Sequence, residues 1–149
     1  MMPLELMRQV ALSLLGKPYV WGGDDPLAGF DCNGLVQEIL KVGGAAPPVR
    51  QTAQGLYNYF QPFARRGVVE LGSLAFFGRS TDNITHVAWV LDGRHMVEAG
   101  GGDGETKTLG DAIRQNAYVR VRPLTHRKDL VAVLRPVYSF EHVGEGNQT

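Results

Sequence analysis

Apolar residues recur at helical spacing in the first third of the chain. Residues 4–15 carry one apolar stripe that a glycine follows: Leu4, Met7, Ala11, Leu14 and then Gly16. Residues 35–40 carry a second stripe: Leu35, Val36, Ile39 and Leu40. Asp31 stands at the N-cap position before the second stripe, and Gly43-Gly44 stands where that helix should end. We expect a third, shorter helix at Thr52–Phe60.

Short apolar runs separated by turn residues replace this pattern after residue 70. They predict five strands, at Leu74–Phe77, Ile84–Leu91, Arg94–Ala99, Tyr118–Pro123 and Leu130–Tyr138. The segments between them are expected to be a polar loop (Gly78–Asn83), a hairpin turn (Asp92-Gly93), a mobile glycine-rich loop (Gly100–Gly104) and a helical turn (Asp111–Gln115). Helices followed by antiparallel strands predict one α+β domain over residues 1–140. Glu141–Thr149 is expected to be a disordered tail.

Composition narrows the function classes. The chain has 149 residues, enough for one domain with a substantial core, and 15 basic residues balance 15 acidic ones. This balance argues against a nucleic-acid binder, and no apolar run approaches the length of a membrane span. A single cysteine excludes an internal disulfide. The N-terminus has no basic segment followed by an apolar one, so we expect no signal peptide, cytoplasmic synthesis, and any export by another route.

The one cysteine, Cys32, lies in the first turn of the second predicted helix, directly after a glycine-rich loop. Free backbone N–H groups and the positive end of the helix dipole favour an anion there, so they favour thiolate over thiol. This position is typical of a sulfur nucleophile. On the cysteine alone, the alternative of a small buried apolar residue stays open.

A thiolate nucleophile needs a histidine to protonate the leaving amine. His86 opens an apolar strand whose neighbours would hold its ring rigidly, although a purely structural histidine remains an alternative. His126 lies in a polar stretch and His142 in the tail, so both are expected on the surface. The histidines have no paired ligand spacing, and one cysteine cannot build a thiolate-rich zinc site. We therefore expect neither a metal nor another cofactor.

Four segments together resemble the NlpC family of bacterial cell-wall cysteine peptidases: Gly16–Gly23, Gly29–Leu35, Leu74–Gly78 and Ile84–Ala88. The resemblance implies a papain-like fold, with N-terminal helices packed on a central antiparallel sheet, the cysteine at a helix N-terminus and the histidine on the sheet. It also implies hydrolysis of the γ-D-glutamyl–diaminopimelate (or lysine) bond in peptidoglycan stem peptides.

The resemblance assigns roles to individual residues. Cys32 matches the nucleophile and His86 the base. Tyr19 matches a tyrosine of the site, although core packing would also explain it. Asp31 matches a residue that helps to bind the free amine of the substrate in some members, which is compatible with N-capping. Asn33 stands where the family usually has serine, which keeps hydrogen-bonding capacity but changes the subsite.

The residue that orients the histidine in this family is usually His, Asn or Gln, twelve positions after it. In this chain that position is Glu98. A carboxylate can accept the Nδ1–H of His86 and stabilise the imidazolium, as the acid does in Ser-His-Asp enzymes. A surface glutamate is the alternative.

The turn at Asp92-Gly93 decides between Glu98 and His95 as the orienting residue. A two-residue turn pairs Leu91 with Arg94 and turns Glu98 away from His86, which leaves His95 on the correct face but at the far end of the strand. A three-residue turn with Gly93 in the left-handed region pairs Val90 with Arg94 and His86 with Glu98. We predict the second turn and Glu98.

These features predict a hydrolase of peptidoglycan stem peptides that binds neither nucleic acid nor membrane. Without a signal peptide or wall-binding module, we expect a bare catalytic domain that a phage tail, a lysis system or a secretion system delivers, so a phage-tail or secretion protein is its expected partner. Two alternatives remain: a papain-like amidase or acyltransferase with another substrate, and a non-catalytic phage-tail assembly domain.

Overall fold

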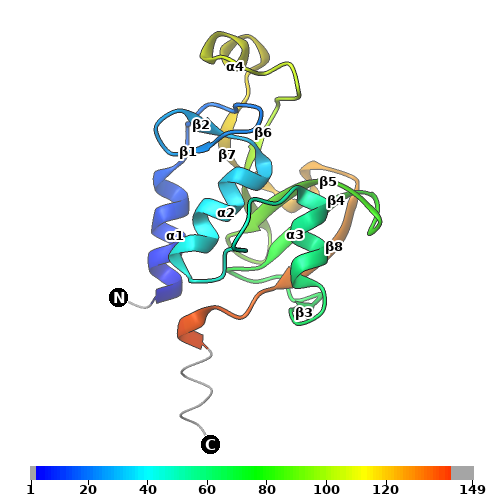
Figure 1. Cartoon of the computed structure of the whole chain (residues 1–149). Coiled ribbons are helices and arrows are strands. Elements are labelled where there is room, and N and C mark those ends of the chain that lie inside the picture. Colours follow the sequence, from blue (N-terminus) through cyan, green and yellow to red (C-terminus); the bar gives the residue numbers. More distant parts are fainter. Residues whose placement is uncertain (1–2, 142–149) are drawn as a thin grey trace, which may run out of the picture.

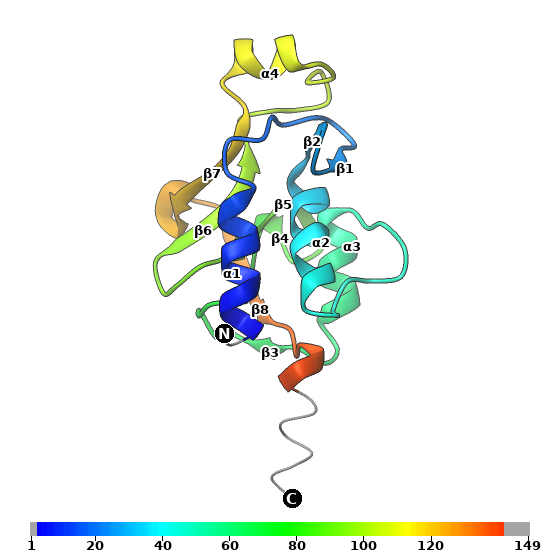
Figure 2. The ribbon, with the colours of Figure 1, turned by 90° about the vertical axis from the view of Figure 1, so that its left-hand side faces the viewer.

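The computed structural model describes residues 3–141 and contains a six-stranded antiparallel sheet with three helices on one face (Figures 1 and 2). The strand order is β3-β8-β4-β5-β6-β7. The helices are α1 (Pro3–Ser13), α2 (Cys32–Val42), α3 (Ala53–Phe60) and α4 (Leu109–Gln115), with a 3-10 turn, η1, at Leu124–His126. The sheet strands are β3 (Arg65–Arg66), β4 (Leu74–Ser80), β5 (Asn83–Val90), β6 (His95–Gly100), β7 (Tyr118–Pro123) and β8 (Leu130–Arg135). The predicted α+β class is confirmed.

Side-chain caps fix the helices where the sequence predicts them. Asp31 caps α2, and the N–H of Gly43 closes its other end by donating to the carbonyls of the last turn. Thr52 caps α3 by accepting the Gly55 N–H at 3.0 Å. The three predicted N-terminal helices are therefore confirmed, with α1 ending three residues before Gly16.

The turned view shows α1, α2 and α3 beside the sheet (Figure 2). The main hydrophobic core contains side chains of these helices and of strands β4 to β8, so it lies between the helices and the sheet. The opposite face of the sheet carries a smaller apolar cluster: Ala75, Phe77, Ala88, Val90, Met96 and Leu124. Because side chains alternate along each strand, β4 and β5 contribute to both clusters, which holds their backbones rigidly in the middle of the sheet.

The hairpin of β4 and β5 is longer than the sequence predicts. β4 continues to Ser80 and β5 begins at Asn83, so most of the polar loop expected at Gly78–Asn83 is strand and only two residues turn. Polar residues are tolerated there because the end of the hairpin is exposed. Two one-residue irregularities interrupt this pairing: Thr85 has no partner on β4, and Arg79 has none on β5.

The C-terminal prediction is correct for β7, too long for β8, and wrong for Glu141. β8 ends at Arg135, not Tyr138, because Pro136 cannot donate to a ladder. Glu141 is not in a disordered tail, since its carboxylate binds the Arg135 guanidinium at 2.6 and 2.8 Å. The rest of the predicted tail, with His142, lies outside the described residues.

The sequence reading missed three strands of two residues each: β1 (Asp24–Asp25), β2 (Gly29–Phe30) and β3. β1 and β2 form a small separate ribbon in the glycine-rich loop before Cys32. α4 extends the expected helical turn to seven residues. Over residues 3–141, the structure has no helix that is both long and apolar enough to cross a membrane.

Candidate active site

The first turn of α2 presents the Cys32 thiol to a cleft. The Asp31 carboxylate fixes this turn, because Oδ1 accepts the Gly34 N–H at 2.8 Å and Oδ2 accepts the Gly22 N–H at 2.9 Å. Gly34 allows the preceding loop to lie against the helix, since a Cβ there would meet the Gly23 carbonyl oxygen at 2.0 Å. Cys32 is therefore held at a helix N-terminus with 8% of its surface exposed.

His86 lies on β5, on the face that carries the smaller apolar cluster. Its partner across β4, Phe77, packs against the imidazole with ring centroids 5.5 Å apart. Nε2 of His86 lies 2.7 Å from Oε1 of Glu98 on β6. Burial lowers the pKa of His86, but hydrogen bonds with Cys32 and Glu98 outweigh it and raise the pKa from 6.5 to about 9. The raised pKa therefore favours the imidazolium form of His86 between the thiol and the carboxylate.

Glu98 is a buried carboxylate, 4% exposed. Burial raises its pKa, but the hydrogen bond to His86 and the positive charges of His86, His126 and Arg127 outweigh it and hold the pKa below the ordinary value. Nε of Arg122 lies 4.0 Å from Oε2 of Glu98. Glu98 is thus an anion that can stabilise the His86 imidazolium.

The ring of His86 is oriented the other way round from the prediction. We expected Glu98 to accept from Nδ1, but it binds Nε2. Because Glu98 reaches His86 diagonally from β6, Nε2 is the nitrogen that meets its carboxylate, and Nδ1 is left free of Glu98.

The pairing of β5 with β6 fits neither of the two turns considered from the sequence. Trp89 pairs with Val97 and Val90 with Met96. The predicted pairing of Val90 with Arg94, and of His86 with Glu98, is therefore wrong by two residues. A shift of two leaves the alternation of side chains unchanged, so Glu98 still lies on the same face as His86 and reaches it diagonally.

The Asp92 side chain explains why the three-residue turn lies one residue later than predicted. Its Oδ1 accepts the N–H of Arg94 at 2.7 Å and of His95 at 2.8 Å, and the Leu91 N–H donates to the His95 carbonyl at 2.8 Å. The loop therefore comprises Asp92–Arg94, and Gly93 does not adopt the predicted left-handed conformation. His95 binds Asp92 in this exposed turn, away from His86.

Two further residues predicted for the site, Tyr19 and Asn33, lie near Cys32. Tyr19 is buried and lines the cleft; burial, followed by the negative charges of Cys32, Asp31 and Asp103, raises the pKa of its hydroxyl. Asn33 accepts from the Cys32 thiol at 3.6 Å and donates to the Gln51 carbonyl.

The carboxylate of Asp31 already accepts hydrogen bonds from other groups of the protein. Besides its two backbone bonds, Oδ1 accepts from Nη2 of Arg50 at 2.6 Å, and the residue is 7% exposed. It is not among the residues that line the cleft.

The cleft over Cys32 and His86 has a volume of about 410 Å³. Three residues that line the cleft were not predicted from the sequence to belong to the site: Trp21, His126 and Arg127. The exposure of His126 was predicted, but its place beside Glu98 depends on how the chain between β7 and β8 folds back, for which the sequence has no local signal. Residues 100–104 form the opposite wall.

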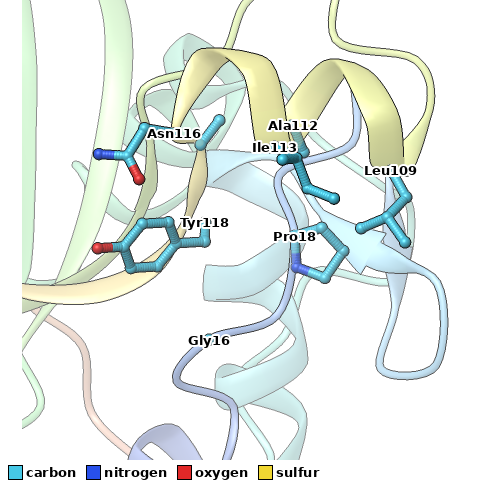
Figure 3. A pocket seen from close by; sticks show the side chains of 8 residues that line it. Gly16, Pro18, Leu109, Ala112, Ile113, Asn116 and Tyr118 are labelled. Atoms are coloured by element: carbon cyan, nitrogen blue, oxygen red, sulfur yellow. The ribbon is translucent and has the colours of Figure 1, made fainter.

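A second hollow, of about 280 Å³, lies under α4 (Figure 3). Its lining is mainly apolar: Gly16, Pro18, Leu109, Ala112, Ile113, Asn116, Ala117 and Tyr118. Its lining contains none of the acid, base or thiol groups of the cleft.

Comparisons with known proteins agree with this geometry. The model of the NlpC/P60 family matches residues 16–123. The bifunctional muramidase/DL-endopeptidase CwlT of Bacillus subtilis is 38% identical over 93 residues, which cover 60% of this chain and 27% of CwlT. The murein DD-endopeptidase MepH of Escherichia coli is 29% identical over 136 residues, 85% of this chain and 46% of MepH. The chain thus spans less than half the length of either relative.

The fold is also that of solved structures. A protein of the NLP/P60 family from Staphylococcus aureus superposes with a TM-score of 0.65 at 26% identity, covering 92% of this chain and 42% of the other. The predicted papain-like arrangement, with helices on one face of an antiparallel sheet, is therefore confirmed.

Proposed function

Because this chain belongs to the NlpC/P60 family, we propose that it is a cysteine peptidase that hydrolyses the peptide stems of peptidoglycan. The observation that carries this proposal is the placement of His86, which lines one open cleft together with the Cys32 thiol and is hydrogen-bonded to the buried Glu98. A nucleophile, a base and an acceptor that orients the base are the parts that acyl transfer requires.

The geometry supports the following reaction. The Cys32 thiolate attacks the carbonyl carbon of the scissile amide while Glu98 stabilises the His86 imidazolium. His86 then gives its proton to the leaving nitrogen, the C–N bond breaks, and a thioester on Cys32 remains. Water attacks the thioester, His86 takes one proton from that water, and the acid product leaves as the thiolate re-forms.

We further propose the γ-D-glutamyl–diaminopimelate or γ-D-glutamyl–lysine amide as the bond cleaved. Tyr19, Asp31 and Asn33 are our candidates for binding the acyl side of the peptide. Because Asp31 is bonded to Gly22, Gly34 and Arg50, we expect its main effect to come through the shape of the loop that it holds. Delivery by a phage tail, a lysis system or a secretion system also remains a proposal.

Digestion of purified sacculi tests the proposal. Released fragments identified by mass spectrometry should include stems cut at one γ-D-glutamyl amide, and Cys32→Ala protein should release none. Iodoacetamide should alkylate native protein at neutral pH faster than His86→Ala protein. Products that carry an added amine instead of a free acid would indicate an acyltransferase. Binding to sacculi without any released fragment would contradict a hydrolase and favour an assembly domain.

A further inference from the structure

A polar groove continues the cleft beyond His86. It is lined by Gly78, Arg79, Asn83, Thr85 and Asp129 and has a volume of about 650 Å³. Thr85 lines both the cleft and this groove, so the two hollows meet beside the chain neighbour of His86.

Both irregularities of the β4–β5 hairpin contribute to this groove. Thr85 and Arg79 are the two residues without a partner in the ladder, and both line it. Bulges re-aim side chains and are common beside active sites. Gly78 permits this arrangement, because a Cβ there would meet the Asn83 carbonyl oxygen at 2.1 Å.

The end of the hairpin is fixed rather than loose. The Gln54 side chain on α3 accepts the Ile84 N–H at 2.8 Å and donates to the Thr81 carbonyl at 2.9 Å. The Gly78 N–H donates to the Asp129 carbonyl at 2.9 Å. The groove is therefore a preformed surface whose shape does not depend on a ligand.

Two charged residues line the groove, Arg79 and Asp129, and among the described residues only Asp129 has a charged partner. Asp129 is neutralised by Arg127, which binds it through two hydrogen bonds of 2.9 and 2.8 Å. Arg79 is exposed, and within residues 3–141 its side chain has no hydrogen bond or ion pair to another residue. Asn83 and Thr85 add neutral hydrogen-bonding groups. One free guanidinium with polar neighbours is suited to a carboxylate.

The reaction determines which part of the substrate lies there. His86 delivers its proton to the leaving nitrogen, so the residue that carries this nitrogen lies on the His86 side of the scissile bond. Thr85 and the groove extend from that side. The end of the cleft with Tyr19, Trp21 and Asp103 is left for the acyl part of the peptide.

We propose that Arg79, with Asn83 and Thr85, binds a free carboxylate on the side chain of the leaving-group residue. This inference rests on the proposed function and sharpens it. Diaminopimelate carries a carboxylate at the end of its side chain and lysine does not, so the protein prefers diaminopimelate stems.

The test uses three peptides that differ only at this group: diaminopimelate, its side-chain amide, and lysine at the leaving position. For the parent protein, kcat/KM should be about 10- to 100-fold higher for diaminopimelate than for the other two. Arg79→Gln should bring the diaminopimelate value down to the lysine value, mainly through KM, and Arg79→Lys should restore part of it. Arg94→Gln removes an exposed arginine from the other hairpin and should keep the full preference.

A binding experiment separates this inference from the proposed function. Diaminopimelate and lysine, each joined to D-alanine, are titrated into Cys32→Ala protein while the amide signals of Asn83 and Thr85 are followed by NMR. Tighter binding of diaminopimelate that Arg79→Gln abolishes supports the subsite, even if the parent protein hydrolyses nothing. Equal affinity for both ligands, or a preference that survives Arg79→Gln, overturns it.

Discussion

Two ion pairs lie in different regions of this molecule and have almost the same geometry. Nε2 of His86 is 2.7 Å from Glu98, and Nη2 of Arg135 is 2.6 Å from Glu141. His86, Glu98 and Arg135 are each less than 10% exposed. The side chain of Glu141 is 29% exposed, so the second pair is buried on the arginine side only. The N···O distances alone do not distinguish the proposed catalytic pair from the other.

The surroundings of the two ion pairs distinguish them. The other contacts of Arg135 are also with groups of the fold: it donates to the Pro136 carbonyl at 2.6 Å, lies 3.5 Å from Oε2 of Glu70 and lies over the Tyr138 ring at 5.1 Å. His86 instead contacts the one thiol of the chain and borders an open cleft. A buried ion pair thus indicates a catalytic site only where a reactive group and a substrate can reach it. Otherwise the ion pair stabilises the fold.

The largest expected effect comes from removing the reactive group. Cys32→Ala should lower stem-peptide hydrolysis by about 10⁴-fold or more, and His86→Ala should do nearly the same, because nucleophile and base act as one unit. Turnover measured on purified muropeptides checks both variants. Since the thiol contributes chemistry rather than core volume, Cys32→Ala should melt close to the parent temperature. Substantial turnover by either variant would contradict the role given to Cys32.

Removing each of the two carboxylates in turn tests the comparison of the two pairs directly. Glu98→Ala should lower kcat/KM by about 10²- to 10⁴-fold, since His86 loses its orienting acceptor, while Glu98→Gln should retain more activity through its amide oxygen. Glu141→Ala should instead cost about 2 kcal/mol of unfolding free energy, because Arg135 loses its main partner.

Activity and thermal unfolding should therefore separate the two variants. At a temperature where both are folded, Glu141→Ala should hydrolyse muropeptides at close to the parent rate. If Glu98→Ala lost only stability, or Glu141→Ala lost only activity, the distinction between the pairs would be wrong.

The same contrast shows what could be predicted from the sequence. The cap Asp31 and the strand Tyr118–Pro123 follow from local chemistry, and the sequence predicts them correctly. Glu98 was reached through its spacing from His86, yet its pairing register was wrong, because the side chain of Asp92 bonds two N–H groups and moves the turn one residue along the chain.

Other features depend on residues far apart in the sequence. Arg127 comes beside Glu98 only because the chain after β7 folds back across Phe77. Glu141 was assigned to a disordered tail from its place near the end of the sequence, whereas its ion pair with Arg135 depends on how the chain turns after β8. No local sequence pattern predicts either contact.

The pH dependence of stability should also differ between the pairs. The pKa of His86 is raised from 6.5 to about 9, so the stability that the charged ring contributes is complete below pH 6.5 and is lost as pH rises through about 9. The lowered pKa of Glu98 gives the opposite limb: its contribution is present above the ordinary value of 4.5 and is lost as pH falls below it.

The melting temperature of the parent protein should therefore fall as the pH is raised from 6 to 9.5. The fall should be shallower in Glu98→Gln, whose amide no longer favours the imidazolium. Glu141→Ala should melt lower throughout but keep the slope of the parent, because arginine stays protonated over this range. Parallel curves for the parent and Glu98→Gln would show that Glu98 does not set the charge of His86.

The smallest effect is expected at the end of the β5–β6 hairpin, where His95 and Asp92 form a third pair, exposed to solvent, with Nδ1 and Oδ1 at 3.1 Å. Because water screens this pair and His95 lies at the far end of the strand from His86, His95→Ala should keep kcat/KM within about twofold of the parent. Asp92→Ala is the stronger test, since it removes the acceptor for two backbone N–H groups that hold the observed turn. It should lower the melting temperature slightly, and activity should fall only if the register of Glu98 slips. A His95→Ala variant as inactive as His86→Ala would reverse the assignment and make His95, not Glu98, the group that orients the catalytic ring.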